Sequence, residues 1–193
     1  MEAIDYLRSH QFTVADFHKM AEIGVFREDT RLELIQGGIV EMAPIGSKHA
    51  GIVNWLTANL SRSAKNRAIV GTQNPVVLND KNELYPDLSV LKPTAKFYTD
   101  VHPHPKDVLL LIEVSDTTLG YDQRVKIPLY AKNGILETWI IDIENHCIHV
   151  YREHLLQYSH YQQMETVREG LLSIQADPSI QIDVTDLFKA CLS

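Results

Sequence analysis

Cysteine and long apolar runs are both scarce in this chain of 193 residues. The two cysteines, Cys147 and Cys191, make no pair with metal-ligand spacing, and we expect both to be free thiols in a reducing compartment. The longest apolar run, residues 108–112, is far too short to span a bilayer. Residues 1–5 are acidic where a signal peptide would be basic and then apolar, so we expect a cytoplasmic protein.

Basic residues are fewer than acidic ones, 18 against 25. The formal net charge of −7 weighs against a protein that coats nucleic acid through a broad basic surface. It does not exclude a nuclease, because the acids of a metal site count toward that total and bound metal would offset part of it. The chain also lacks a glycine-rich phosphate loop and a serine nucleophile elbow. With 45% hydrophobic and 22% charged residues, we expect one globular domain, residues 1–193.

Helical and strand patterns alternate along the chain, which predicts an α/β (α+β) fold with a mixed sheet and helices against it. Thr13 is the expected N-cap of a short helix that ends before Gly24. Gly37-Gly38 is the expected turn of an N-terminal hairpin, and residues 48–63 show the clearest long helical spacing. The remaining expectations are strands at 68–71, 75–78, 87–91, 108–114, 137–142 and 146–152, a turn at 79–82, a loop at 92–106, a helix at 122–133 and a short helical turn near Leu187.

Two carboxylates stand out because they lie in or beside apolar strands. Asp87 begins the strand at 87–91, and Glu113 interrupts the strand at 108–114. Burying an unpaired carboxylate costs several kcal/mol, so each acid needs a cation, hydrogen bonds or a shifted pKa. If the two strands form a hairpin, the start of the first lies beside the end of the second. Two acids that converge at a strand end suggest a divalent metal, and a metal suggests hydrolysis.

A set of motifs in fixed order points to a known family. In chain order they are R-L-E-L-I-Q-G-G-I-V-E-M at 31–42, His49, Pro86-Asp87, I-E-V-S at 112–115, D-Q-R-V-K at 122–126, Tyr130 and T-W-I-I-D at 138–142. The chain resembles the bacterial putative restriction endonucleases of the Uma type, which have the restriction-endonuclease-like PD-(D/E)XK fold. The resemblance covers roughly residues 12–190.

The resemblance implies a central mixed sheet flanked by helices, with an N-terminal helix and hairpin. It also implies metal-dependent cleavage of DNA by a catalytic set that consists of Asp87, Glu113, Lys126 and Glu33. The simple motif places a lysine two residues after Glu113, where this chain has Ser115. In this family the lysine has moved to the following helix, and Lys126 occupies that position here.

Each metal ligand has a plainer alternative. Asp87 would bind Mg²⁺ or Mn²⁺, which prefer carboxylate and water oxygens, although in isolation a turn residue after Pro86 is the better interpretation. Glu113 would bind the same ion, and its alternative is a buried ion pair with an arginine or lysine. We favour the metal for both acids. The backbone carbonyl of Val114 would supply a further oxygen.

The other candidate residues are less distinctive. Lys126 would hold the attacking water or stabilise charge on the scissile phosphate, and its alternative is an exposed i, i+4 pair with Asp122. Glu33 would be an outer-sphere or third metal partner, although the alternating pattern alone favours a solvated strand face. His49 would contact phosphate or orient an acid, or it is an ordinary histidine at a helix terminus.

Several conspicuous residues have structural interpretations. His102 and His104 stand between prolines in a loop without ligand spacing, and we assign them no metal. Trp55 and Trp139 are expected in the core. Three basic residues are expected to form a solvated helix end: Arg62, Lys65 and Arg67.

The leading hypothesis is a Mg²⁺- or Mn²⁺-dependent endonuclease that hydrolyses DNA phosphodiester bonds. The alternative is a non-catalytic binding protein that keeps the nuclease fold. Cutting both strands of a duplex with one site per chain favours a homodimer. Apolar and aromatic residues near the C-terminus would either cover a partner or pack on their own sheet: Tyr151, Leu155, Leu156, Tyr158 and Tyr161.

Overall fold

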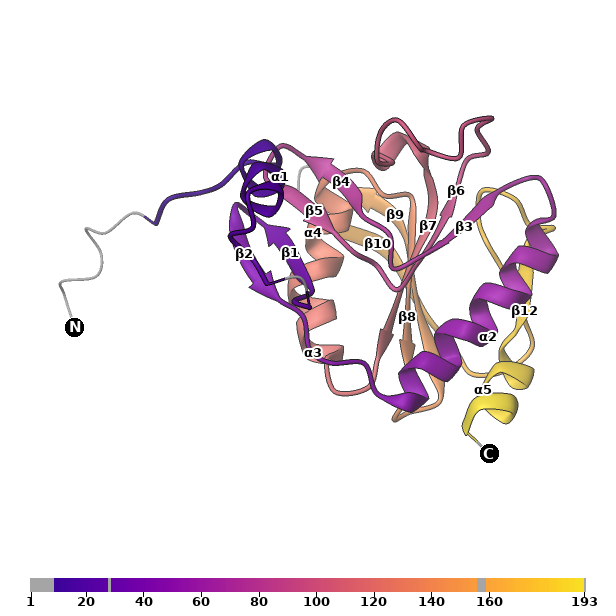
Figure 1. Cartoon of the computed structure of the whole chain (residues 1–193). Helices are drawn as coiled ribbons and strands as arrows, with labels where there is room; N and C mark the ends of the chain where they lie inside the picture. The colour runs from indigo at the N-terminus through magenta and orange to yellow at the C-terminus, as the bar shows by residue number, and fades with distance from the viewer. Residues whose placement is uncertain (1–8, 28, 156–158, 193) are drawn as a thin grey trace.

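Two β-sheets of different size organise the described part of the chain (Figure 1). The structure is a computed structural model, and it describes residues 9–27, 29–155 and 159–192. The larger sheet has the strand order β10-β9-β8-β7-β6-β3, and the smaller has the order β2-β1-β5-β4. In the larger sheet β7 and β8 are parallel while their neighbours are antiparallel, so the predicted mixed sheet is confirmed.

Most elements lie close to where the sequence predicts them. The larger sheet comprises β3 (Ile69–Thr72), β6 (Leu88–Leu91), β7 (Val108–Ser115), β8 (Glu137–Asp142), β9 (Cys147–Leu155) and β10 (His160–Val167). The smaller sheet comprises β1 (Leu32–Ile35), β2 (Gly38–Glu41), β4 (Val76–Asn79) and β5 (Asn82–Leu84), and β11 (Leu171–Ser173) pairs with β12 (Gln181–Asp183). The helices are α1 (Val14–Glu22), α2 (Ser47–Ala64), the 3-10 turn η1 (Pro105–Asp107), α3 (Leu119–Tyr121), the π-helical turn η2 (Asp122–Lys126), α4 (Ile127–Lys132) and α5 (Val184–Leu192).

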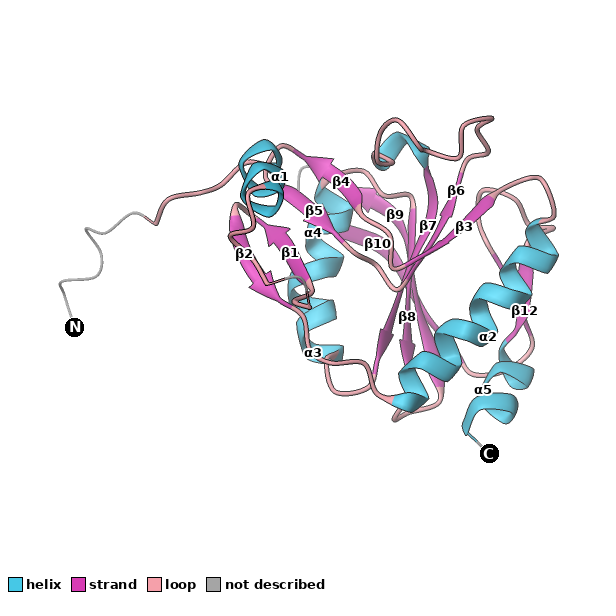
Figure 2. Ribbon diagram, in the orientation of Figure 1, coloured by secondary structure: helices cyan, strands magenta, loops and turns pink. Residues whose placement is uncertain are grey.

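Helices lie on both faces of the larger sheet (Figure 2). On one face, α2 and α5 pack over alternate residues of β7, which are Leu110, Ile112 and Val114. On the other face, Leu111 packs with residues of α4 and of the smaller sheet. Because both faces of β7 are covered, its sequence is a nearly continuous apolar run, and Glu113 is an exception that points away from α2.

The N-terminal elements confirm one prediction and correct another. Thr13 caps α1 as predicted, and its hydroxyl oxygen accepts a hydrogen bond from the backbone N–H of Asp16 at 3.1 Å. The β1–β2 turn is formed by Gln36 and Gly37, with φ angles of 51° and 74°, and Gly38 already belongs to β2. The predicted Gly37-Gly38 turn is therefore shifted by one residue. Gly37 is required there, because a Cβ atom would lie 2.6 Å from the Cβ of Gln11.

Two predicted connections differ from the structure. The turn at 79–82 leads into β5, which pairs with β4 and belongs to the smaller sheet, so β4 does not turn directly into β6. Strand β5 was missed because Asn82 and Glu83 are polar, although both are buried. The predicted helix at 122–133 begins earlier, at Leu119, and contains a π-helical turn. The C-terminal region also contains β10, β11 and β12, for which the sequence analysis gave no strand.

Most of the remaining core predictions concern residues that the structure describes. Trp139 is fully buried, and Trp55 is partly buried against the same core cluster. Tyr151 and Tyr161 pack on their own sheet, against Ile140 and α4. Leu155 is partly buried, whereas Leu156 and Tyr158 lie outside the described residues.

Both cysteines are free, as predicted. A search of the described helices for one long and apolar enough to cross a bilayer finds none.

Candidate active site

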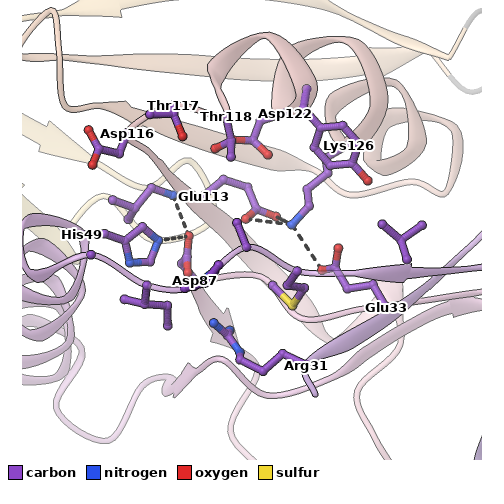
Figure 3. A pocket seen from close by; sticks show the side chains of 18 of the residues that line it. Arg31, Glu33, His49, Asp87, Glu113, Asp116, Thr117, Thr118, Asp122 and Lys126 are labelled. Carbon is purple, nitrogen blue, oxygen red and sulfur yellow. Dashed lines mark hydrogen bonds and ion pairs between the residues drawn. The ribbon is translucent and has the colours of Figure 1, made fainter. Parts of the chain in front are cut away.

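The β6–β7 hairpin brings Asp87 beside Glu113, as the sequence predicts. Leu88 pairs with Ile112 in antiparallel register, so the residue before Leu88 lies next to the residue after Ile112. Asp87 Oδ2 accepts a hydrogen bond from the backbone N–H of Val114 at 2.9 Å. Figure 3 shows this contact among the residues that line a pocket. The geometry depends on local register alone, which is why it could be predicted.

Lys126 lies between two buried acids rather than on an exposed helix face. Its Nζ atom is 3.2 Å from both carboxylate oxygens of Glu113 and 3.2 Å from Oε1 of Glu33 (Figure 3). The alternative of an exposed Asp122–Lys126 pair is therefore wrong. Glu33 does not lie on a solvated strand face either, since it is only 2% exposed. The buried ion pair considered as the alternative for Glu113 is present, with Lys126 as its cation.

The π-helical turn explains how Lys126 reaches this position. Ile127 N–H donates to the carbonyl of Asp122, five residues earlier, and α4 carries a proline, Pro128, in its first turn. A proline has no N–H and its ring crowds the carbonyl four residues before it, so the preceding turn widens. The widened turn leaves Lys126 and Asp122 buried on the side that faces β7.

Ser115 occupies the motif position of the missing lysine and has a different role. Its Oγ donates a 2.6 Å hydrogen bond to Oδ2 of Asp122, and Thr118 donates to the same oxygen at 2.8 Å. Burial raises the pKa of Asp122 despite these bonds. The serine thus ties β7 to the turn that supplies Lys126.

Asp87 is held in its ionised form by its neighbours. Its Oδ2 lies 3.0 Å from Nε2 of His49, and Gln73 Nε2 is 3.3 Å from Oδ1. Burial favours the neutral acid, but interactions with His49, the Val114 N–H and Lys126 together outweigh it and lower the pKa of Asp87. His49 therefore orients an acid, one of the two roles considered for it. Its Nδ1 atom is buried and has no hydrogen-bond partner among the described residues.

The pKa of Glu113 shifts in the opposite direction to that of Asp87. Burial raises its pKa well above the ordinary value, although the Lys126 charge opposes that shift. Tyr130 on α4 also donates its hydroxyl to Glu113 Oε1 at 2.5 Å. The charges of Glu113 and Glu33 raise the pKa of Lys126 despite its burial, so the ammonium stays protonated. Glu33 and Glu113 therefore share one buried ammonium, that of Lys126.

The pocket has a volume of about 320 Å³ and lies between the β1–β2 hairpin, the start of α2 and the segment from β7 to η2. Its charged lining is mostly acidic, with Arg31 and Lys126 as cations beside His49. The six acids are Glu33, Glu41, Asp87, Glu113, Asp116 and Asp122. The sequence analysis gave no site role to three of these acids, Glu41, Asp116 and Asp122. Only Asp122 could have been found from the sequence, because it lies four residues before Lys126.

The donor set fits a hard divalent cation. Asp87 and Glu113 offer carboxylate oxygens, and Val114 also lines the pocket. Magnesium is commonly bound by one or two carboxylates together with water and substrate phosphates. Within the described ranges, no three His, Cys, Asp or Glu side chains of this pocket lie close enough to enclose an ion alone. An ion here would keep positions for water and substrate.

Other residues singled out in the sequence lie elsewhere. His104 Nδ1 is 3.0 Å from the carbonyl of Val77, outside the pocket lining. At the end of α2, Arg67 pairs with Asp177 at 2.9 Å. These contacts agree with the structural interpretations given above.

The architecture and the acidic pocket define a protein with a restriction-endonuclease-like fold. The chain belongs to the Uma2 family, described as "Putative restriction endonuclease", whose model matches residues 14–185. It is similar in structure to a protein from Anabaena variabilis ATCC 29413 described as a putative nuclease belonging to DUF820. The TM-score is 0.71 at 19% sequence identity, over 94% of this chain and 99% of that one. A search of curated proteins finds no match.

Proposed function

We propose that this protein is a metal-dependent endonuclease that hydrolyses DNA phosphodiester bonds, with Mg²⁺ or Mn²⁺ as its cofactor. The observation that carries the proposal is the convergence of Asp87, Glu113 and Lys126 in one pocket, although the lysine comes from a separate helical turn. Membership of a family described as restriction endonucleases supports the same chemistry.

Charge explains why the pocket needs a cation to accept DNA. A phosphodiester is an anion, and six carboxylates surround the space it would enter. Asp87 and Glu113 would hold the metal, with the carbonyl of Val114 as a further donor. When bound, the ion would lower the pKa of a water and neutralise charge on the phosphate oxygens.

The other groups of the pocket would have separate roles. His49 and Val114 N–H fix the orientation of Asp87, and Tyr130 fixes that of Glu113. The Lys126 ammonium would stabilise charge that develops on the scissile phosphate or hold the attacking water. Glu33 is a supporting acid, because it accepts from Lys126 and is anchored by the backbone N–H of Tyr85 at 2.9 Å.

The direct test is incubation of the purified protein with plasmid and with single-stranded DNA in Mg²⁺ or Mn²⁺. We expect metal-dependent nicking that is lost in Asp87→Ala and Glu113→Ala. Glu169→Gln is the matched control, because it removes a carboxylate charge from an exposed position outside the pocket. Nicking that persists in both pocket variants would refute these assignments.

A second candidate is a non-catalytic binding protein with the nuclease fold. The formal charge of −7 and the presence of Ser115 at the motif position favour it. Calorimetry with Mn²⁺ separates the two functions, since the nuclease requires binding at neutral pH. Absence of Mn²⁺ binding together with absence of nicking would refute the nuclease and favour the second candidate.

We also propose that the protein acts as a homodimer in the cytoplasm, with one site for each strand of the duplex. In the described part of the chain, β10 is an edge strand of the larger sheet, and an unpaired edge can accept a strand from a second copy. Light scattering at micromolar concentration should give twice the chain mass of 22.0 kDa. A monomer alone would rule the dimer out.

A further inference from the structure

Three side chains of different chemistry converge where β8 turns into β9. Asp142 ends β8, Cys147 begins β9 and pairs with it across the hairpin, and His149 follows on the same face of β9. His149 Nε2 is 3.3 Å from Asp142 Oδ2 and 3.8 Å from Cys147 Sγ. Donor atoms of all three residues lie within 4.8 Å of one another, and none of the three lines the acidic pocket.

The two separations from His149 Nε2 are close to the edges of a tetrahedral metal site. Zinc binds a thiolate at about 2.3 Å and an imidazole nitrogen or carboxylate oxygen at about 2.0–2.1 Å. For tetrahedral angles, those bond lengths place nitrogen about 3.3 Å from oxygen and about 3.6 Å from sulfur. The observed distances of 3.3 Å and 3.8 Å require little rearrangement.

The arrangement does not fit a catalytic Cys–His–Asp relay. In a relay the acid contacts one ring nitrogen and the nucleophile contacts the other. Here Asp142 and Cys147 both approach Nε2, while Nδ1 lies 3.1 Å from Thr166 Oγ1 on β10. Burial and the charge of Asp142 also raise the pKa of the Cys147 thiol, the opposite of an activated nucleophile.

Neighbouring groups hold two of the three donors, Asp142 and His149, in place. Asn145 donates to both oxygens of Asp142, from its backbone N–H at 2.9 Å and its side chain at 2.8 Å. Burial opposes ionisation of Asp142, but these bonds and His149 keep its pKa below the ordinary value. Thr166 fixes the ring of His149 in the way that outer partners orient metal-binding histidines.

We propose that Asp142, Cys147 and His149 form a second metal site, specific for Zn²⁺ or a similar transition-metal ion. A carboxylate and a thiolate would balance the charge of a divalent ion, and the thiol proton would be released on binding. The fourth position is left for water. The ion would join the end of β8 to β9 and stabilise the hairpin, independently of the acidic pocket.

Titration with Co²⁺ as a spectroscopic probe tests this site. We expect one Co²⁺ per chain to give visible bands of a tetrahedral ion and a near-ultraviolet thiolate-to-cobalt band, both displaced by Zn²⁺. Cys147→Ser should remove the thiolate band, whereas Cys191→Ser, the control at the other cysteine, should keep it. Failure of Co²⁺ to produce a thiolate band in the unmodified protein would overturn the proposal, as would a band that depends on Cys191.

A second variant and readout guard against misfolding of Cys147→Ser. Zn²⁺ should raise the melting temperature of the unmodified protein, and His149→Gln should abolish that rise while its circular dichroism spectrum stays native. An unchanged Zn²⁺-induced rise in His149→Gln would show that the three residues form only a structural ion pair beside a buried thiol.

Discussion

The acidic pocket and the Asp142–Cys147–His149 cluster lie on the same face of the larger sheet but offer different donors. Glu113, Ile140 and His149 form one cross-strand row, which places the two sites two strands, or about 10 Å, apart. The pocket offers carboxylate oxygens and already contains the Lys126 ammonium. The cluster combines oxygen, nitrogen and sulfur. Ligand chemistry, more than position in the fold, would therefore direct hard cations to one site and softer ones to the other.

The two sites also differ in how they are assembled. Lys126 reaches Glu33 across 93 residues of sequence, so the pocket forms only when both sheets and the π-helical turn are in place. The cluster belongs to neighbouring strands and needs only the β8–β9 register. Substitutions in the pocket should therefore affect activity and folding together, whereas substitutions in the cluster should have more local effects.

The largest effect should come from removing a pocket ligand. Glu113→Gln keeps the shape of the side chain but lowers its affinity for a divalent cation, and we expect nicking to fall by about a hundredfold or more. The Co²⁺–thiolate absorption should be unchanged, since Glu113 is not part of that cluster. Parallel loss of both signals would show that the two sites are not independent.

Lys126→Met should be the most destabilising substitution in the pocket. It leaves Glu33 and Glu113 buried without their cation, which costs about 3–5 kcal/mol for pairs of this kind. Mg²⁺ should recover part of that loss, because it replaces the missing positive charge. Urea unfolding with and without Mg²⁺ measures both effects. Lys132→Met is the control, because Lys132 is exposed at the end of the following helix, α4, and its substitution should alter neither value.

Substitutions of His49 and His149 test whether each histidine serves only one of the two sites. His49→Ala should weaken Mn²⁺ binding by about 10–100-fold, because Asp87 loses the partner that orients it. It should leave Co²⁺ binding to the cluster intact, and His149→Ala should do the reverse. Calorimetry and absorption measure the two ions separately, with His102→Ala as the control. Equal effects of both variants on both ions would contradict the assignment of one histidine to each site.

The smallest effect is expected at the basic end of α2. Arg67→Ala removes an exposed ion pair with Asp177, and such pairs contribute little because water and salt screen them. We expect an unchanged melting temperature and unchanged nicking. A marked loss of DNA cleavage would instead indicate that this helix end contacts DNA.

Local sequence patterns predicted many elements of the fold and the proximity of Asp87 to Glu113 in the pocket. Helix α2 and the β6–β7 hairpin follow from short-range periodicity, and the hairpin alone brings Asp87 beside Glu113. The burial of Glu33 could not be inferred from its strand, because alternation does not reveal that α4 and η2 cover that face. Strand β5 was hidden for a related reason. Its buried Glu83 is compensated by His18, 65 residues away, at 2.6 Å.

The metal site that we propose at Cys147 could not have been found from the spacing of the cysteines. Cys147 and Cys191 have no ligand spacing along the chain, which is correct but incomplete as a test for a metal site. The partners of Cys147 are Asp142, across the β8–β9 hairpin, and His149, two residues further along β9. Their convergence depends on strand register and side-chain direction, neither of which spacing along the sequence provides.

The central claim is that Asp87 and Glu113 hold one hard divalent cation. A crystal soaked in Mn²⁺ and measured at a wavelength with strong manganese anomalous scattering tests it directly. We predict a single anomalous peak in the pocket at about 2.0–2.3 Å from an oxygen of each carboxylate. An empty pocket at saturating Mn²⁺, with Lys126 still bonded to both Glu33 and Glu113, would contradict the account.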